Sequence, residues 1–226
     1  MSSRALDVDC WLGAEVIDFG LFGPFVLAAL LLVVIPGPDM VMIVALGSRD
    51  GRAAGVAAAA GVSAGLAVHA LIAVLGLSTL LHKLPAVYLG LKWAGVLYLI
   101  YLAVTTIRTK PPTVDHSKAV PGQHRSPWAA FRSAMITNVL NPKVILFNVA
   151  FLPQFINPHL GHVPLQLAVL GVVLVVIDFC IDGPIGYFAG TLGQRITSAG
   201  TRSARRINRA VATVYLALAG WVAATA

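Results

Sequence analysis

Charged residues are scarce in this chain. Only 11% of its 226 residues are Asp, Glu, Lys or Arg, whereas 58% are hydrophobic and the mean hydropathy is +0.85. A soluble domain contains about 25% charged and about 45–50% apolar residues. The composition therefore excludes a soluble globular protein and predicts an integral membrane protein. The polar stretches are too short to fold as separate domains, so nothing soluble is left to carry an independent activity.

The sequence also lacks the signatures of several enzyme classes. Its two cysteines, Cys10 and Cys180, have no metal-ligand spacing and do not predict a structural disulfide. No Walker sequence, nucleophile elbow or HEXXH motif is present, so neither ATP-driven pumping nor the known membrane-protease chemistries are supported. We assign no catalytic residue, no metal site and no cofactor.

Six apolar segments are long enough to cross a bilayer, which takes about 20 residues. They predict an all-α domain over residues 20–226, preceded by an acidic extension over 1–19 that has no signal-peptide features. The predicted spans are Leu21–Leu46, Val56–Leu81, Val87–Ile107, Ser133–Leu152, Leu165–Leu192 and Ala210–Ala226.

The basic residues, which give a net charge of +7, are distributed asymmetrically. Connectors one, three and five hold twelve Lys and Arg residues, whereas the N-terminal tail and the second connector hold one each. This positive-inside bias sets topology and gives no indication of nucleic-acid binding. It predicts cytoplasmic connectors one, three and five, including a linker over 110–127, and places both termini outside.

Two of the predicted spans carry a polar, proline-centred break. The first reads IPGPDM, Ile35 to Met40, and the second reads TNVLNPK, Thr137 to Lys143. Irregular backbone at membrane depth survives only where protein or a water-filled cavity covers it. Six spans with breaks in the first and fourth suggest two copies of a three-span unit in opposite orientations, the inverted-repeat plan of many secondary transporters. The breaks are then the predicted substrate site.

In the first break, Pro36 and Pro38 each lack an N–H and interrupt the helix. Gly37 between them permits a turn. Asp39 would lie where a second half-helix begins. It is either a cap for that half-helix or a group that contacts substrate or a proton.

The fourth-span break contains Asn138 and Asn141, which share a helix face, followed by Pro142 and Lys143. Asn141 could cap a half-helix whose first residue is Pro142. A lysine in a span faces a cavity or a partner, so Lys143 pairs either with an acidic side chain or with a substrate carboxylate. The two amides could hold an amino or carboxyl group.

The remaining ionisable residues within spans are candidates for proton coupling. Asp178 and Asp182 are four residues apart in the fifth span and share one face. Burial favours the protonated form of a carboxyl group, although either aspartate could instead neutralise Lys143. Asp39 is a further candidate. His69, in the second span, is either a relay or an interior hydrogen-bond donor.

At these residues the chain resembles the lysine-exporter superfamily, in its homoserine/threonine-exporter branch. Ala103 and the Asp182–Pro184 sequence depart from the usual pattern of the branch. The resemblance covers the chain from about Leu21 onward and rests on these strings: IPGPDM, SRDGRAAGV, GLAVHALIAVLGL, LKWAGVLYLIYLA and FRSAMITNVLNPKVILFNVAFLPQFINP.

The resemblance implies a multi-pass protein of the bacterial plasma (inner) membrane that exports amino acids, in exchange for protons. We therefore predict a secondary transporter for homoserine, threonine or another small neutral amino acid. Its partners would be that substrate, protons, the lipid bilayer and a further copy of the chain in a homo-oligomer. The alternative is a cation-conducting channel or cation exporter lined by the three aspartates. A membrane-embedded enzyme is a more distant possibility.

Overall fold

The computed structural model describes residues 16–77, 85–108, 125–189 and 201–224. Within these ranges every regular element is a helix, which confirms the all-α prediction. Most of the predicted extension over 1–19 and of the predicted linker over 110–127 lies outside the described residues.

Two spans are broken where the sequence predicts it. Helix α2, Phe19–Val34, is followed by α3, Pro38–Asp50, at an angle of 49°. Helix α7, Pro127–Val139, is followed at 50° by a segment that begins with α8, Pro142–Leu146. That segment continues as the π-helix η3, Phe147–Phe151, and the 3-10 helix η4, Leu152–Phe155.

Two helices are long and apolar enough to cross a membrane unbroken. The first is α4, Arg52–Ile72, with its π-helical extension η1, Ala73–Leu77. The second is α9, Val163–Tyr187, which follows the short 3-10 helix η5, Pro158–Leu160. With each bent pair counted as one span, up to four spans are found by length and composition in the described residues.

Two more helices occupy the places of the predicted third and sixth spans. They are α6, Pro85–Arg108, and α11, Thr201–Ala224, of 24 residues each. In the described part of the chain only Trp93–Arg108 of this pair stands out, as a shorter apolar helix. The count of six spans therefore stays a prediction.

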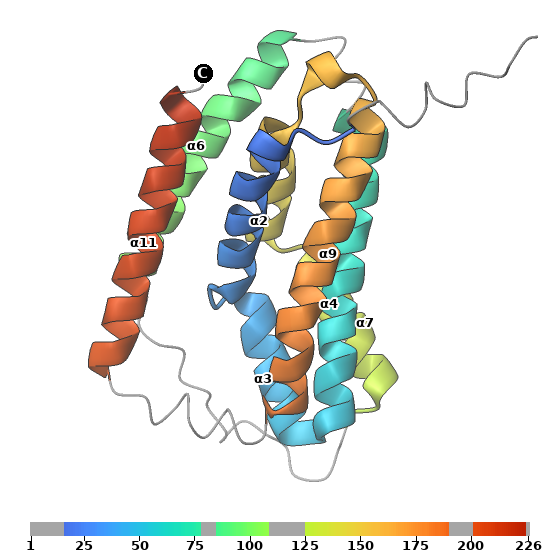
Figure 1. Ribbon diagram of the computed structural model, residues 1–226. Helices are drawn as coiled ribbons and strands as arrows, with labels where there is room; N and C mark the ends of the chain where they lie inside the picture. Colours follow the sequence, from blue (N-terminus) through green and yellow to red (C-terminus); the bar gives the residue numbers. More distant parts are fainter. Residues whose placement is uncertain (1–15, 78–84, 109–124, 190–200, 225–226) are drawn as a thin grey trace, which may run out of the picture.

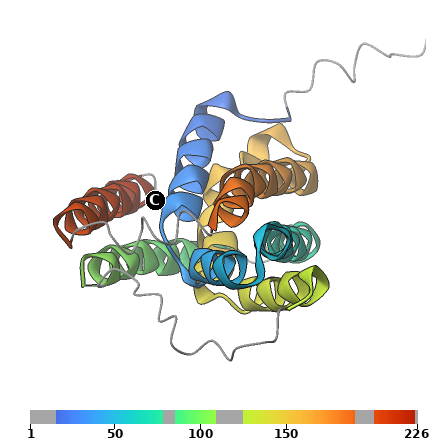
Figure 2. The same cartoon turned by 90° about the horizontal axis from the view of Figure 1, so that it is seen from below.

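The helices form a cluster with a two-helix flank. Helix α4 packs against α7, α9 and α3, whereas α6 and α11 pack chiefly against each other, to one side of the cluster (Figure 2). The two broken segments run in opposite directions, since α2 leads down to α3 while α7 starts at the lower end and its chain rises (Figure 1). This antiparallel arrangement agrees with the predicted inverted repeat.

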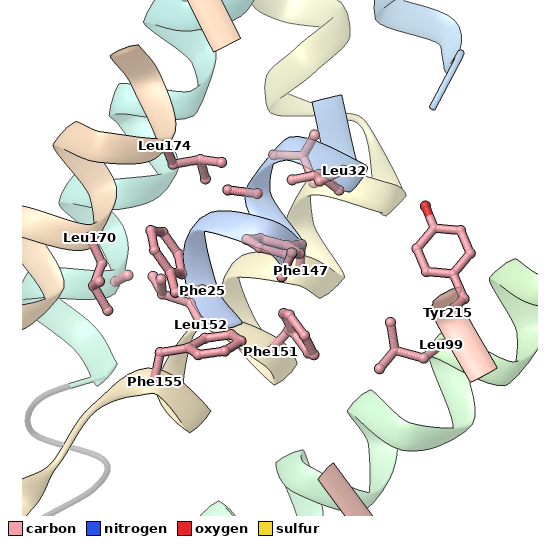
Figure 3. Close-up of a cluster of buried hydrophobic side chains, with 14 of the residues drawn as sticks. Phe25, Leu32, Leu99, Phe147, Phe151, Leu152, Phe155, Leu170, Leu174 and Tyr215 are labelled. Carbon is pink, nitrogen blue, oxygen red and sulfur yellow. The ribbon is translucent and has the colours of Figure 1, made fainter. Parts of the chain in front are cut away.

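Aromatic side chains fill the space between the broken segments and the flank. Phe25 of α2 lies edge-on to Phe155 with ring centroids 5.4 Å apart, and Phe151 meets Phe155 at 4.9 Å (Figure 3). Leu99 of α6 and Tyr215 of α11 approach this cluster from the flank. The core therefore joins both halves of the chain around the ends of the broken spans.

The ends of the helices are held by side-chain contacts. Asp18 caps α2 by accepting from the Gly20 N–H, and it also accepts from Asn157 Nδ2, each at 2.8 Å. These bonds, the one from Asn157 above all, hold the pKa of Asp18 below its usual value. Gln166 in turn bonds the Asn157 and Gly161 carbonyls. The start of the first span is thus fixed to the turn that precedes α9.

At the opposite end of the molecule, α3 and α4 close tightly against the end of α9. A Cβ on Gly47 would lie 2.5 Å from the Ala189 Cβ, and Gly55 and Gly186 are in direct backbone contact. Ser48 Oγ donates to the Ala189 carbonyl at 2.8 Å. This packing leaves no room for larger side chains, so it holds the end of α9 in place below the broken spans.

Candidate functional site

Each half-helix at the breaks starts in the same way. Pro38 is the first residue of α3 and Pro142 the first of α8, the position where a missing N–H costs nothing. Asn141 caps α8, because its Oδ1 accepts from the Lys143 N–H at 3.0 Å. Asp39 and Lys143 therefore occupy equivalent positions, one residue after the proline.

Lys143 spans the two breaks. Its Nζ donates to the Leu32 carbonyl at 2.5 Å and to the Ile35 carbonyl at 3.0 Å, both at the end of α2. In an unbroken helix the Leu32 carbonyl would accept from residue 36, which is proline and has no N–H. Lys143 supplies the missing donor and places a positive charge at the negative end of α2.

This contact differs from the expectation that Lys143 pairs with an acidic side chain. No ion pair of Lys143 is present among the described residues, and its partners are backbone carbonyls. The reason is local, since the proline frees a carbonyl that must be satisfied inside the protein.

Asp39 connects the first break to the second. Its Oδ2 accepts from Asn138 Nδ2 at 3.0 Å and from Asn141 Nδ2 at 2.6 Å. Both asparagines are buried, with 1% and 3% of their surface exposed. Asn141 thus caps α8 and also donates to Asp39, whereas its binding of a substrate group stays a prediction.

The α9 aspartates complete the site. Asp178 accepts from Ser63 Oγ of α4 at 2.6 Å, and Asp182 lies one turn further along the same face. Both are buried. The helix continues through Pro184 to Tyr187. As their spacing predicts, Asp178 and Asp182 lie on one face of α9, and both line a cavity together with residues of the two breaks.

A cavity of about 30 Å³ lies between the breaks and α9. It has room for about two water molecules, far less than an amino acid occupies. The site is therefore closed around itself in this conformation. Its lining residues are Leu32, Val33, Ile35, Gly37, Asp39, Met40, Leu66, Asn138, Lys143, Val144, Asp178 and Asp182.

Of the eight residues predicted to bind substrate, four line the cavity and four do not. Gly37, Asp39, Asn138 and Lys143 line the cavity, whereas Asn141 stands behind Asp39. Pro36, Pro38 and Pro142 shape the backbone and are not among the lining residues.

Gly37 lies in the bend between α2 and α3, but its backbone conformation does not require glycine. Its φ of −123° and ψ of −174° are open to any residue, so no special turn requires glycine there. A Cβ at this position would lie 3.7 Å from the Lys143 ammonium nitrogen, which is an ordinary van der Waals contact.

His69 does not line the cavity, although it is buried on α4 and its Nε2 has no partner among the described residues. Two participants were not predicted. Ser63 holds Asp178, and Gly65 leaves the space that the Asn138 side chain fills, since a Cβ on Gly65 would lie 2.6 Å from Asn138 Oδ1. Both lie on α4 in the GVSAGLAVHA run, where a single serine among small residues was the available signal.

Comparison with known proteins identifies the family of this chain. Residues 30–225 match the family model of the LysE type translocator. The chain is 31% identical over 194 residues to a homoserine/homoserine lactone efflux protein of Salmonella typhimurium, covering 85% of this chain and 90% of the relative. An uncharacterized membrane protein of Pseudomonas aeruginosa is 34% identical over 159 residues, or 70% and 74% of the two chains.

An uncharacterized membrane protein of Vibrio cholerae is 28% identical over 209 residues, 92% of this chain and 98% of the relative. No solved structure matches. Because the family model begins at residue 30 and the first lining residue is Leu32, the model covers every residue that lines the cavity. The chain is a membrane protein that belongs to the LysE type translocator family.

Proposed function

We propose that this protein is a secondary transporter that exports a small amino acid or a derivative of one from the bacterial cytoplasm. One observation carries the proposal. The two broken spans meet at a buried cavity that contains both an ammonium group, on Lys143, and carboxyl groups, on Asp39, Asp178 and Asp182. An amino acid carries both of the complementary charges.

The relatives support the substrate class. Two of them, from Salmonella typhimurium and Salmonella typhi, are homoserine/homoserine lactone efflux proteins and share 31% and 30% identity with this chain. Broken helices whose ends face a midplane site are a recurring device for binding small polar substrates in membranes. Homoserine, threonine and their relatives are therefore the first compounds to test.

The size of the cavity favours a transporter over a channel. A conducting pore needs a continuous polar path, whereas this cavity holds about two water molecules between apolar side chains such as Leu66 and Val144. Substrate entry requires the helices around the breaks to move apart. Alternating exposure of one central site to the two sides of the membrane is the behaviour expected of a secondary transporter.

The test is a counterflow screen in proteoliposomes loaded with single amino acids. We expect saturable, stereoselective exchange, with L-threonine preferred over D-threonine. Flux that fails to distinguish the two enantiomers, or that follows monovalent cations alone, would point to the channel instead. Absence of exchange across the full panel, with correctly folded protein in the vesicles, would remove the proposal.

We further propose that export is coupled to protons through the carboxyl groups of the cavity. Asp39 contacts both breaks, and Asp178 and Asp182 lie against them on α9. Asp39→Asn and Asp178→Asn are each measured with and without an imposed pH gradient. We expect at least one variant to lose gradient-driven accumulation while keeping exchange. If both accumulate substrate as the parent does, Asp182 and His69 are the remaining candidates.

A further inference from the structure

A second cavity adjoins the one at the breaks. It measures about 10 Å³, enough for about one water molecule, and Leu32 of α2 lines both cavities. Its other walls come from α6, α8, η3 and α11, so it lies where the broken spans meet the two-helix flank. Leu99, Phe147 and Phe151 of these walls belong to the cluster drawn in Figure 3. The lining is apolar apart from two tyrosines.

Tyr215 of α11 brings a buried hydroxyl group to this second cavity. The residue is 4% exposed, and its hydroxyl oxygen has no hydrogen-bond partner among the described residues. Buried tyrosine hydroxyls usually find a partner, and a buried polar group that is left unpaired is destabilising. Figure 3 shows Tyr215 reaching from α11, with the hydroxyl oxygen at the free end of the ring. A ligand group that enters the second cavity would therefore find an unused donor and acceptor there.

The second cavity, like the first, is built by both halves of the chain. Tyr98 of α6 also lines it, and both tyrosines lie near the middle of their helices. Each is the seventh residue of a similar string, KWAGVLYL from Lys92 and RAVATVYL from Arg209. The predicted inverted repeat thus pairs Tyr98 with Tyr215. Secondary transporters bind substrate near the middle of the membrane, at the interface between their repeats.

Leu32 is the partition between the two cavities. Neither cavity is large enough for an amino acid, so binding has to open further space. Val33, Ile35 and Val144, also in the apolar wall of the first cavity, are β-branched and stiff about χ1, whereas leucine changes rotamer more freely. Displacement of Leu32 opens the first cavity into space that already exists.

We propose that the second cavity is the side-chain subsite of the substrate site and that Tyr215 determines its specificity. The charged end of the substrate occupies the first cavity, and its side chain extends past the displaced Leu32 toward Tyr215. A hydroxyl group at the end of that side chain pairs with the Tyr215 hydroxyl. The site then prefers a hydroxylated side chain to an alkyl side chain of the same size. The inference rests on the proposed function for the location of the charged end, but it concerns what recognises the side chain.

The test compares L-homoserine with L-norvaline, which has a methyl group in place of the terminal hydroxyl. Each is measured as a competitor of labelled L-homoserine counterflow and, independently, for thermal stabilisation of the purified protein. We expect the parent to prefer homoserine by about tenfold or more, because norvaline leaves a buried hydroxyl unpaired. Tyr215→Phe keeps the ring and removes only the hydroxyl, so the preference should fall to about threefold or less.

The control for the hydroxyl is Tyr101→Phe. Tyr101 also lies on α6, but it is 59% exposed and lines neither cavity. This variant should keep the preference of the parent. An equal loss of preference in Tyr101→Phe and Tyr215→Phe would overturn the assignment of Tyr215.

A second pair of variants tests the partition. Leu32→Ala joins the two cavities, so the use of L-norleucine relative to the shorter L-norvaline should rise by about threefold or more. Leu170→Ala makes the same truncation at a buried position on α9 that lines neither cavity, and it should leave this ratio unchanged. An unchanged ratio in Leu32→Ala would overturn the joined site. If Leu32→Ala does not fold, the comparison of Tyr215→Phe with the parent still decides.

The outcomes separate this inference from the proposed function. Stronger stabilisation by homoserine than by norvaline, lost in Tyr215→Phe and found without any exchange, would support the subsite and remove the transport proposal. Exchange without a preference between the two amino acids, or with a preference that Tyr215→Phe leaves unchanged, would keep the transport proposal and overturn the subsite. Absence of both exchange and stabilisation would overturn both.

Discussion

Lys143 is the residue on which the closed junction depends most directly. Its ammonium group replaces the N–H that Pro36 cannot offer to the Leu32 carbonyl. In Lys143→Met we expect the free energy of unfolding to fall by about 1–3 kcal/mol for each buried carbonyl left unsatisfied, which lowers the thermal stability. We also expect loss of export. Heating of the purified variant followed by gel filtration measures the first effect, and proteoliposome exchange the second.

The control is Arg132→Met, at an exposed position in the middle of α7. It removes a cation without touching the cavity and should change neither quantity. A Lys143→Met protein that is as stable as the parent would show that the bonds to α2 contribute nothing, and one that still exports would remove Lys143 from the site.

Gly65 shapes the site without contacting a ligand. A methyl group there would meet the Asn138 side chain at 2.6–3.0 Å, so Asn138 would have to turn away from Asp39. We expect Gly65→Ala to reduce exchange by about tenfold or more, as loss of a charge-assisted hydrogen bond implies. Gly23→Ala is the matched control, since nothing lies within 4 Å of the added Cβ. Equal exchange by the two variants would contradict this role for Gly65.

Much of the site could be predicted from residue type alone. Polar and charged residues are so costly within a span that Asp39, Asn138, Lys143, Asp178 and Asp182 were identified directly. Their partners could not be predicted. A carbonyl freed by proline carries no side-chain signal, and a single serine in a helix of small residues is ambiguous. Pairing depends on how α4 and α9 pack, which is a property of the folded chain.

The breaks in α2–α3 and α7–α8 are the elements that distinguish this fold from a plain helix bundle. Their existence was predictable because proline removes a donor and clashes with the preceding turn. Their bend was not, since it depends on what occupies the gap. Here Lys143, Asp39 and two asparagines occupy it, which fixes both breaks at angles near 50°.

Restoring an N–H at the first break should separate stability from activity. In Pro36→Ala the new N–H can bond the Leu32 carbonyl, so α2 can extend and Lys143 loses its place. We expect unchanged or higher thermal stability with exchange reduced by about tenfold or more. Pro24→Ala, within the continuous part of α2, should also be at least as stable as the parent but keep full exchange. Full exchange in Pro36→Ala would show that the break is dispensable.

For the whole molecule, the described basic residues support the predicted orientation. The α3–α4 turn and the start of α7 lie at the same end of the molecule (Figure 1), and these segments carry Arg49, Arg52, Arg125 and Arg132. The turn around Gly161, which precedes α9, lies at the other end. The positive-inside rule predicts that the first end is cytoplasmic.

The orientation can be measured with single cysteines after Cys10 and Cys180 are replaced by serine. A cysteine at Gly161 should react with a membrane-impermeant thiol reagent in intact cells. One at Ser117, which lies outside the described residues, should react only after the cells are opened. The reverse pattern would invert the topology and turn the proposed exporter's site toward the opposite side.

The matching positions of Asp39 and Lys143 have a consequence for how the two halves recognise each other. If either half met a copy of itself, the buried junction would hold two Asp39 carboxylates or two Lys143 ammonium groups, and like charges repel strongly where the dielectric constant is low. We therefore expect each half to associate with the other half in preference to a copy of itself. When residues 1–110 and 125–226 are produced as separate chains, each should co-purify with the other and not with a tagged copy of itself. The charge reversal Asp39→Lys in the N-terminal half should reduce its co-purification with the C-terminal half.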